Sequence, residues 1–194
     1  MTNDGEVYEF AFRGLLTEEA LDRAGRPSRV GPGVFDADVA EQLSLDVLDE
    51  THVAAAKLMA AVYVAVAAFE NSARELVTTV LREAVGDDWW DKAVSSSIQK
   101  GCKARQEDEE KHRFHTQRGD APINYTDLKN LANIIRANQE HFMPDFIPSA
   151  EWATAIFDTI ERSRNVIMHS GTLDAEDVAR VGMNLRDWVK QVGA

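Results

Sequence analysis

The sequence predicts an all-α fold, built as an antiparallel bundle of helices. After residue 34, apolar residues recur at spacings of three and four, which is the period of an amphipathic helix. No alternation of strand and helix patterns follows, so a parallel sheet or a dinucleotide-binding fold is not expected. Residues 1–34 lack this period and are broken by several glycines and prolines. We therefore expect an irregular N-terminal arm over residues 1–34 and a helical domain over residues 35–194.

The first two helices are expected before residue 86. The first begins with Asp36 or Asp38 as its cap. Its buried stripe would be Val39, Leu43, Val47 and Leu48. A longer helix follows from about Thr51 to Val85. Between Ala54 and Ala68 this helix is apolar all round, which predicts that it is covered on more than one side.

Two further helices are expected in the middle of the chain. One opens at Trp89 and Trp90, which we read as core anchors, and reaches about Lys100. Residues 101–124 are charged and interrupted by glycine and proline, which predicts a mobile connection. The next helix is capped by Thr126 or Asn124 and ends before residue 144. Its inward side chains would be Leu128, Leu131, Ile134 and Ile135.

Two helices complete the predicted bundle. One runs from about Trp152 to Ser170 with Ser149 as its cap, and Gly171 follows as a stop. Its buried stripe would be Trp152, Ile156, Ile160, Ser163 and Ile167. The last helix begins at Thr172 or Asp174. Its stripe would be Val178, Val181, Leu185, Trp188 and Val192.

Composition indicates a globular protein of the reducing cytoplasm. Hydrophobic residues make up 44% of the 194 residues and charged residues 28%. A single cysteine, Cys102, excludes an internal disulfide. The N-terminus lacks the pattern of a secretory leader, so secretion is not expected. The longest apolar run, Leu58 to Phe69, is twelve residues, which is too short to span a bilayer.

The net charge of -12 argues against general nucleic-acid coating. The charge is uneven, however: residues 1–60 hold twelve acids and five bases, whereas residues 99–120 hold five acids and six bases. An RNA substrate would therefore be held locally, along the second stretch. The candidate side chains are Lys100, Lys103, Arg105, Lys111, Arg113 and Arg118. The alternative is an ordinary solvated segment.

The penultimate helix carries a polar group opposite its buried stripe. Asn165 and His169 are four residues apart and hence neighbours on one face, and Arg164 lies between that face and the core. An imidazole can transfer protons near neutral pH, and a guanidinium can hold phosphoryl oxygens with two donors. Alternatively, His169 caps the helix C-terminus and Arg164 pairs with a carboxylate.

At these residues the sequence resembles the HEPN superfamily, whose signature is Arg, commonly a polar residue, about three residues and then His. The spelling here is Arg164-Asn165-Val166-Ile167-Met168-His169. Glu70 and Arg74 resemble the Glu and Arg of the early HEPN helix. They are either an ion pair one turn apart or partners that orient Arg164 or His169. The resemblance covers about Val53 to Val192.

The resemblance implies a metal-independent endoribonuclease with Arg164, Asn165 and His169 as its catalytic residues. It also implies a homodimer in which two motif helices face each other, cleavage of transfer or messenger RNA, and a role in toxin-antitoxin or antiphage defence. An antitoxin or another defence-system protein would be a further partner. The rival interpretation is a noncatalytic helical module that dimerises or docks a partner through the same face, which the acidic charge favours.

No cofactor, metal or membrane partner is expected. The chain contains no glycine-rich phosphate loop, paired Cys-x-x-Cys motif or zinc-protease His-Glu pair. His112 and His115 are three residues apart, but no further cysteine or carboxylate set stands at ligand spacing.

Overall fold

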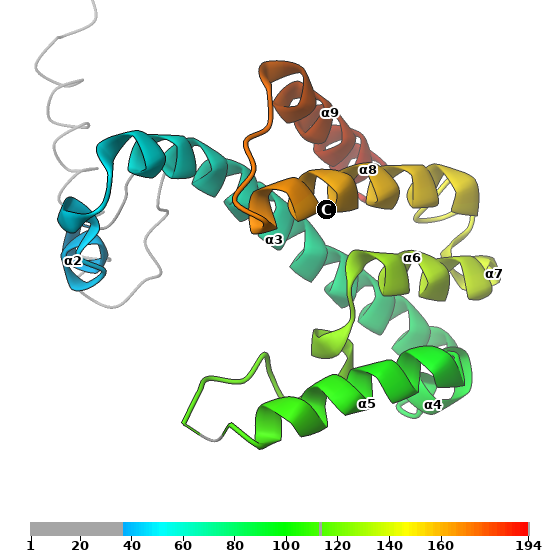
Figure 1. The fold of residues 1–194 in the computed structure, drawn as a ribbon. Coiled ribbons are helices and arrows are strands. Elements are labelled where there is room, and N and C mark those ends of the chain that lie inside the picture. Colours follow the sequence, from blue (N-terminus) through cyan, green and yellow to red (C-terminus); the bar gives the residue numbers. More distant parts are fainter. Residues whose placement is uncertain (1–36, 113, 194) are drawn as a thin grey trace, which may run out of the picture. The chain divides into compact units, whose positions relative to one another are not determined.

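A computed structural model describes residues 37–112 and 114–193. These residues form helices and no strand (Figure 1), which confirms the all-α prediction. The chain divides into two compact units, Met1–Val47 and Leu48–Ala194. The predicted N-terminal arm and its boundary at residue 34 lie outside the described residues.

In the first unit, the structure describes helix α2 (Ala37–Gln42) and the 3-10 turn η1 (Leu45–Val47). Of the predicted caps, Asp36 lies outside the described residues and Asp38 lies inside the helix. Ser44 adopts a left-handed backbone conformation with φ of 52°, which ends the α-helical path. The predicted stripe is therefore wrong, because its helical spacing does not continue past the turn. Its four members, Val39, Leu43, Val47 and Leu48, are all exposed.

The long helix α3 (Glu50–Val85) confirms the predicted helix from Thr51 to Val85. Asp49 caps it, because its carboxylate accepts hydrogen bonds from the backbone N–H groups of Thr51 at 2.9 Å and His52 at 3.3 Å. Gly86 ends it with φ of 99°, a conformation that favours glycine.

The first half of α3 is covered on one side, and the prediction that it is covered on more than one side is wrong. Met59, Val62 and Val66 are buried. Leu58, Tyr63 and Val64 are exposed. The apolar composition therefore overestimates burial here. By length and composition the whole helix α3 is long and apolar enough to cross a membrane, although the twelve-residue run from Leu58 to Phe69 by itself is too short. In the most apolar window of α3, 22% is buried inside the protein.

The middle of the chain differs from the prediction. The helix opened by Trp89 is the short α4 (Trp89–Ala93). A new helix, α5 (Ser96–Glu110), occupies the first part of the segment 101–124 that was predicted as a mobile connection. The Gln99 amide donates to the carbonyls of Trp90 and Val94, both at 2.9 Å, and so satisfies backbone groups opened by the break. Helix formers dominate residues 103–110, and the single Gly101 does not interrupt them.

The 3-10 turn η2 (Pro122–Tyr125) leads into α6 (Leu128–Ala137) and the short α7 (Gln139–Phe142). The cap of α6 is Asp127 rather than Thr126 or Asn124. Its carboxylate accepts a hydrogen bond from the Asn130 backbone N–H at 2.7 Å. The Asn130 side-chain oxygen in turn accepts from the Asp127 backbone N–H, which completes a capping box. The predicted inward residues are confirmed as buried: Leu128, Leu131, Ile134 and Ile135.

The last two helices, α8 (Ala150–Met168) and α9 (Ala175–Val192), begin at the predicted caps Ser149 and Asp174. Aromatic rings join them to α3. The ring of Trp188 lies 5.4 Å from Phe69 and 5.3 Å from Phe157, and Trp152 stacks on it at 5.8 Å. The core of the second unit is therefore centred where α3, α8 and α9 meet.

This arrangement gives the second unit one end that concerns function. Helix α6 packs on α8, and η2 packs on α5. In Figure 1, α5 and α8 both end on the side where α6 begins. The end of α8, the end of α5 and the η2–α6 joint therefore lie at the same end of the bundle.

Candidate functional site

The polar residues of the motif lie in the last turns of α8. Asn165 and His169 are exposed on the same face, and Arg164 is half-buried. The His169 backbone N–H donates to the carbonyl of Asn165 at 3.2 Å, so the histidine stands at the C-terminal cap. The structure thus groups the three predicted catalytic residues at one exposed helix end.

The chain leaves the helix abruptly after His169. Ser170 takes a left-handed conformation with φ of 61°, and the Gly171 N–H donates to the Val166 carbonyl at 2.8 Å. A Cβ at position 171 would lie 2.7 Å from Val166 Cγ1. Glycine at position 171 therefore permits this tight turn, and His169 before it is exposed to solvent.

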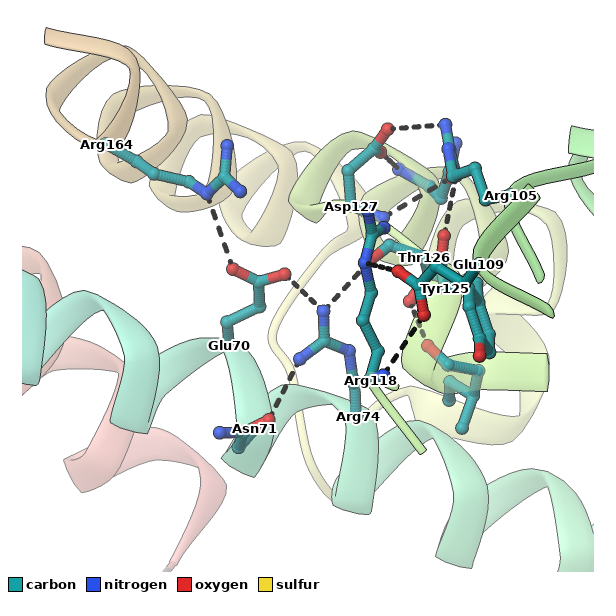
Figure 2. Close-up of polar contacts among 12 residues, drawn as sticks. Glu70, Asn71, Arg74, Arg105, Glu109, Arg118, Tyr125, Thr126, Asp127 and Arg164 are labelled. Atoms are coloured by element: carbon teal, nitrogen blue, oxygen red, sulfur yellow. Dashed lines mark hydrogen bonds and ion pairs between the residues drawn. The ribbon is translucent and has the colours of Figure 1, made fainter. Parts of the chain in front are cut away.

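A buried carboxylate on α3 anchors the arginine of the motif. Glu70 Oε2 lies 3.6 Å from Arg164 Nε, and the exposed fraction of the Glu70 side chain is 11%. The other oxygen of Glu70 pairs with Arg74 one turn along α3. One carboxylate is therefore shared by two guanidinium groups (Figure 2), which offsets the cost of its burial.

Arg74 extends this network toward the start of α6. Its Nη1 donates to Asn71 Oδ1 at 2.9 Å, and its Nη2 donates to the Thr126 carbonyl at 2.9 Å. Its Nε is buried without a hydrogen-bond partner in the described part of the chain. The predicted pair of Glu70 and Arg74 thus reaches Arg164, and through it the motif.

Arg105 holds the same segment from the opposite side. Its Nη1 donates to the Tyr125 carbonyl at 2.6 Å, and its Nη2 lies 3.4 Å from the Asp127 carboxylate. Arg105 therefore binds the residues on both sides of Thr126, while Arg74 binds the carbonyl of Thr126 itself. Figure 2 shows these contacts as a continuous set from α5 to α8.

A comparison with protein-family models identifies the family of this chain. The model described as Swt1-like HEPN matches residues 65–193. This chain belongs to the HEPN superfamily. No curated protein and no solved structure matches the chain. The HEPN match begins within α3 and includes every residue from Glu70 to His169, which confirms the family predicted from the motif; the predicted coverage began earlier, at Val53.

Most of the predicted RNA-binding cations of this HEPN domain have acidic partners. Lys103 lies 3.7 Å from Glu107. Lys111 lies 3.2 Å from Asp108. The other two ion pairs join Arg118 to Glu109 at 2.7 Å and Arg105 to Asp127. Lys100 is exposed, and Arg113 lies outside the described residues. RNA binding by this stretch stays a prediction, with Arg105 engaged in the fold.

Sequence reasoning missed one carboxyl group beside the motif. Glu161 lies on α8, three residues before Arg164, and is half-buried. Burial raises its pKa, and the nearby Asp127 carboxylate adds to that effect. Its spacing of four residues from Asn165 is the signal that could have drawn attention to it.

Within the residues that the structure describes, no three His, Cys, Asp or Glu side chains lie close enough to hold a metal ion.

We expect Arg105→Ala to lower the free energy of unfolding by about 1–3 kcal/mol, because the Tyr125 carbonyl and the Asp127 carboxylate lose a charged donor. Lys103→Ala, which removes a more exposed cation from the same helix, should change it by less than about 0.5 kcal/mol. Denaturant unfolding of both variants measures the difference. Equal losses of unfolding free energy in the two variants would show that the contacts of Arg105 with Tyr125 and Asp127 do not stabilise the fold.

Glu161 should make stability depend on pH. The pKa of Glu161 is raised in the folded state, so the protonated side chain contributes to the free energy of unfolding. This contribution is fully present below the ordinary pKa of 4.5 and is lost as pH rises through the folded-state pKa. Glu161→Gln should therefore be more stable than the parent at about pH 7 and equal to it at about pH 4. Thermal unfolding across this range tests it, with the exposed Glu83→Gln as control. The prediction would be contradicted if the parent became more stable relative to Glu161→Gln as pH rises.

Proposed function

We propose that this HEPN domain is a metal-independent endoribonuclease. The observation that carries the proposal is the anchoring of Arg164 by buried Glu70 beside an exposed Asn165 and His169. The ion pair engages Arg164 Nε, and the two terminal nitrogens extend beyond it (Figure 2). A guanidinium held in this way presents its donors to a phosphate with little further ordering.

The proposed reaction is attack by a ribose 2'-hydroxyl on the adjacent phosphorus. A new oxygen–phosphorus bond forms as the bond to the 5'-oxygen breaks, which leaves a 2',3'-cyclic phosphate and a 5'-hydroxyl. His169 takes the hydroxyl proton or gives one to the leaving oxygen. Arg164 donates to the phosphoryl oxygens as their negative charge grows. Asn165 positions the phosphate or the imidazole.

Local charge supports phosphate binding in an otherwise acidic chain. The protein carries a net charge of -12. At the site, however, the single carboxylate of Glu70 faces Arg74 and Arg164. These three side chains therefore carry one excess positive charge at the edge where Arg164 is half-exposed, beside the half-buried Glu161 carboxyl, whose pKa burial raises.

We further propose that two copies combine through their motif helices, so that His169 and the partner's His169 supply the two proton-transfer groups that such a reaction uses best. The exposed fractions of Val166 and Met168, 39% and 52%, support this pairing. Exposed apolar side chains flanked by polar ones are typical of an interface with an apolar core and a polar rim. A two-fold axis would bring the same patch together on both copies.

The cellular role that we propose follows the family. Cleavage of transfer or messenger RNA would serve toxin-antitoxin or antiphage defence in the cytoplasm, with an antitoxin or another defence protein as regulator. No membrane partner is part of this proposal.

A noncatalytic module that dimerises or docks a partner is the second candidate. The exposed Val166 and Met168 support it as well as they support a dimeric enzyme, and the net charge of -12 favours it.

The chemistry is tested by incubating purified protein with total RNA in EDTA. His169→Ala should lower cleavage about 100-fold or more while the fold is retained, because an exposed cap residue contributes little to stability. Arg164→Lys should lower it about 100-fold, because the ammonium loses the planar pair of donors. Asn165→Ala should do less. The products should carry 2',3'-cyclic phosphate ends.

His52→Ala is the matched control, since His52 is an exposed histidine on another helix. Cleavage that needs a divalent metal, or full activity in folded His169→Ala protein, would rule out the proposed chemistry and favour the docking module.

The dimer is tested by light scattering of Met168→Asp. A charge at the centre of the proposed interface should dissociate the dimer and abolish cleavage with it. Met183→Asp is the control, because Met183 on α9 has a similar exposed fraction of 51%. A monomeric parent protein that cleaves RNA would refute the shared site.

A further inference from the structure

The turn that follows α5 exposes an aromatic ring to solvent. The exposed fraction of Phe114 is 88%, the highest among the large hydrophobic residues that the structure describes. Its neighbours in the sequence are polar or basic: the segment from residue 111 to residue 118 reads Lys-His-Arg-Phe-His-Thr-Gln-Arg. A phenylalanine exposed to this extent gains nothing from burial in its own fold.

Hydrogen bonds hold this turn in place on both sides of the ring. The backbone N–H of His112 donates to the Glu109 carbonyl at 2.9 Å, and that of His115 donates to the His112 carbonyl at 2.9 Å. The His112 ring lies edge-on to Phe114 with centroids 6.2 Å apart. At the far end, Arg118 is fixed to the Glu109 carboxylate through Nε at 2.7 Å and through its backbone N–H at 3.1 Å. The turn therefore presents Phe114 on a hydrogen-bonded support.

The surroundings of Phe114 suit a nucleotide. No Asp or Glu stands between residues 111 and 119. The acidic end of α5 is partly neutralised by the same turn, because Lys111 pairs with Asp108 and Arg118 with Glu109. The other exposed large hydrophobics of the described chain belong to its N-terminal helices and to α8 and α9, so Phe114 forms no contiguous apolar patch of the kind that docks a protein. A single aromatic face among imidazole and cationic groups instead fits one base with its phosphate.

The turn also lies on the side of the domain where the motif lies. Arg118 sits over the Tyr125 ring at 5.8 Å. The Tyr125 carbonyl accepts from Arg105. The Thr126 carbonyl next to it accepts from Arg74, which pairs with Glu70, and Glu70 in turn pairs with Arg164 (Figure 2). In Figure 1, α5 and α8 both end on the side of the bundle where α6 begins.

We propose that Phe114 is a stacking platform for an unpaired base of the RNA substrate, with the imidazoles of His112 and His115 beside it. The proposal rests on the proposed function for its substrate class and adds that the substrate is single-stranded where it is held. Stacking on an aromatic ring needs an open base face, which a duplex does not offer.

Binding is measured on the His169→Ala background, so that cleavage does not enter. A fluorescently labelled single-stranded RNA of about twelve nucleotides and a duplex of the same sequence are titrated by anisotropy. Phe114→Ala should weaken single-strand binding about 5- to 150-fold, the equivalent of about 1–3 kcal/mol, and leave duplex binding unchanged. The salt dependence should keep its slope, because no phosphate contact is removed.

Two variants separate stacking from other roles. Phe114→Trp should retain binding, since it keeps an aromatic face, whereas Phe114→Leu should behave like Phe114→Ala, since it keeps only apolar area. Met183→Ala, which truncates an exposed side chain on α9, should bind like the parent. Unchanged binding in Phe114→Ala, or full binding in Phe114→Leu, would overturn the stacking role. Dissociation of a dimer by Phe114→Ala would overturn it in favour of a protein contact.

The outcomes also separate this inference from the proposed function. A protein that cleaves RNA in EDTA with unchanged binding in Phe114→Ala fails the stacking proposal alone. A protein that never cleaves RNA but loses single-strand binding in Phe114→Ala keeps the stacking proposal and fails the enzymatic one.

Discussion

The shared carboxylate of Glu70 is the interaction on which the rest of the site depends. A buried carboxylate is costly unless it is paired, and here two guanidinium groups, from Arg74 on α3 and Arg164 on α8, meet it. The pairing joins the long helix to the motif helix at one point. It also explains why Arg164 can remain half-exposed yet ordered: one edge is tied to the core, while the rest faces solvent.

The second constraint is the joint between η2 and α6. Arg74 binds the Thr126 carbonyl from one side, and Arg105 binds the Tyr125 carbonyl and the Asp127 carboxylate from the other. A 3-10 turn leaves backbone carbonyls open, and the two arginines satisfy them with charged donors. Cations that a charge count assigns to RNA are thus partly used by the fold. Under the proposed function, the positive charge of Arg164 and the exposed ring of Phe114 are what the fold leaves for an RNA substrate.

Helix α3 serves two purposes along its length. Its second half, within the family match, carries buried Phe69 and Glu70, so the core and the site are built from adjacent residues. Its first half precedes the match at residue 65 and is covered on one side only. The match to the HEPN family model therefore begins inside a helix rather than at its end.

Local order was predictable from the sequence alone. The periods of α3, α8 and α9, the caps Ser149 and Asp174, and the neighbouring positions of Glu70 and Arg74 all depend on residues within one or two turns, and such spacings are visible in the chain. The motif and its exposed face followed from the same rule. The break after α4, the open side of α3 and the left-handed turn at Ser44 after α2 were decided by packing and backbone conformation. The contact of Arg74 with the Thr126 carbonyl joins residues 52 positions apart, and a backbone acceptor has no side-chain signature. Only the folded chain could show that Arg105 belongs to the joint, because its partners are a carbonyl and a cap that a charge count does not see.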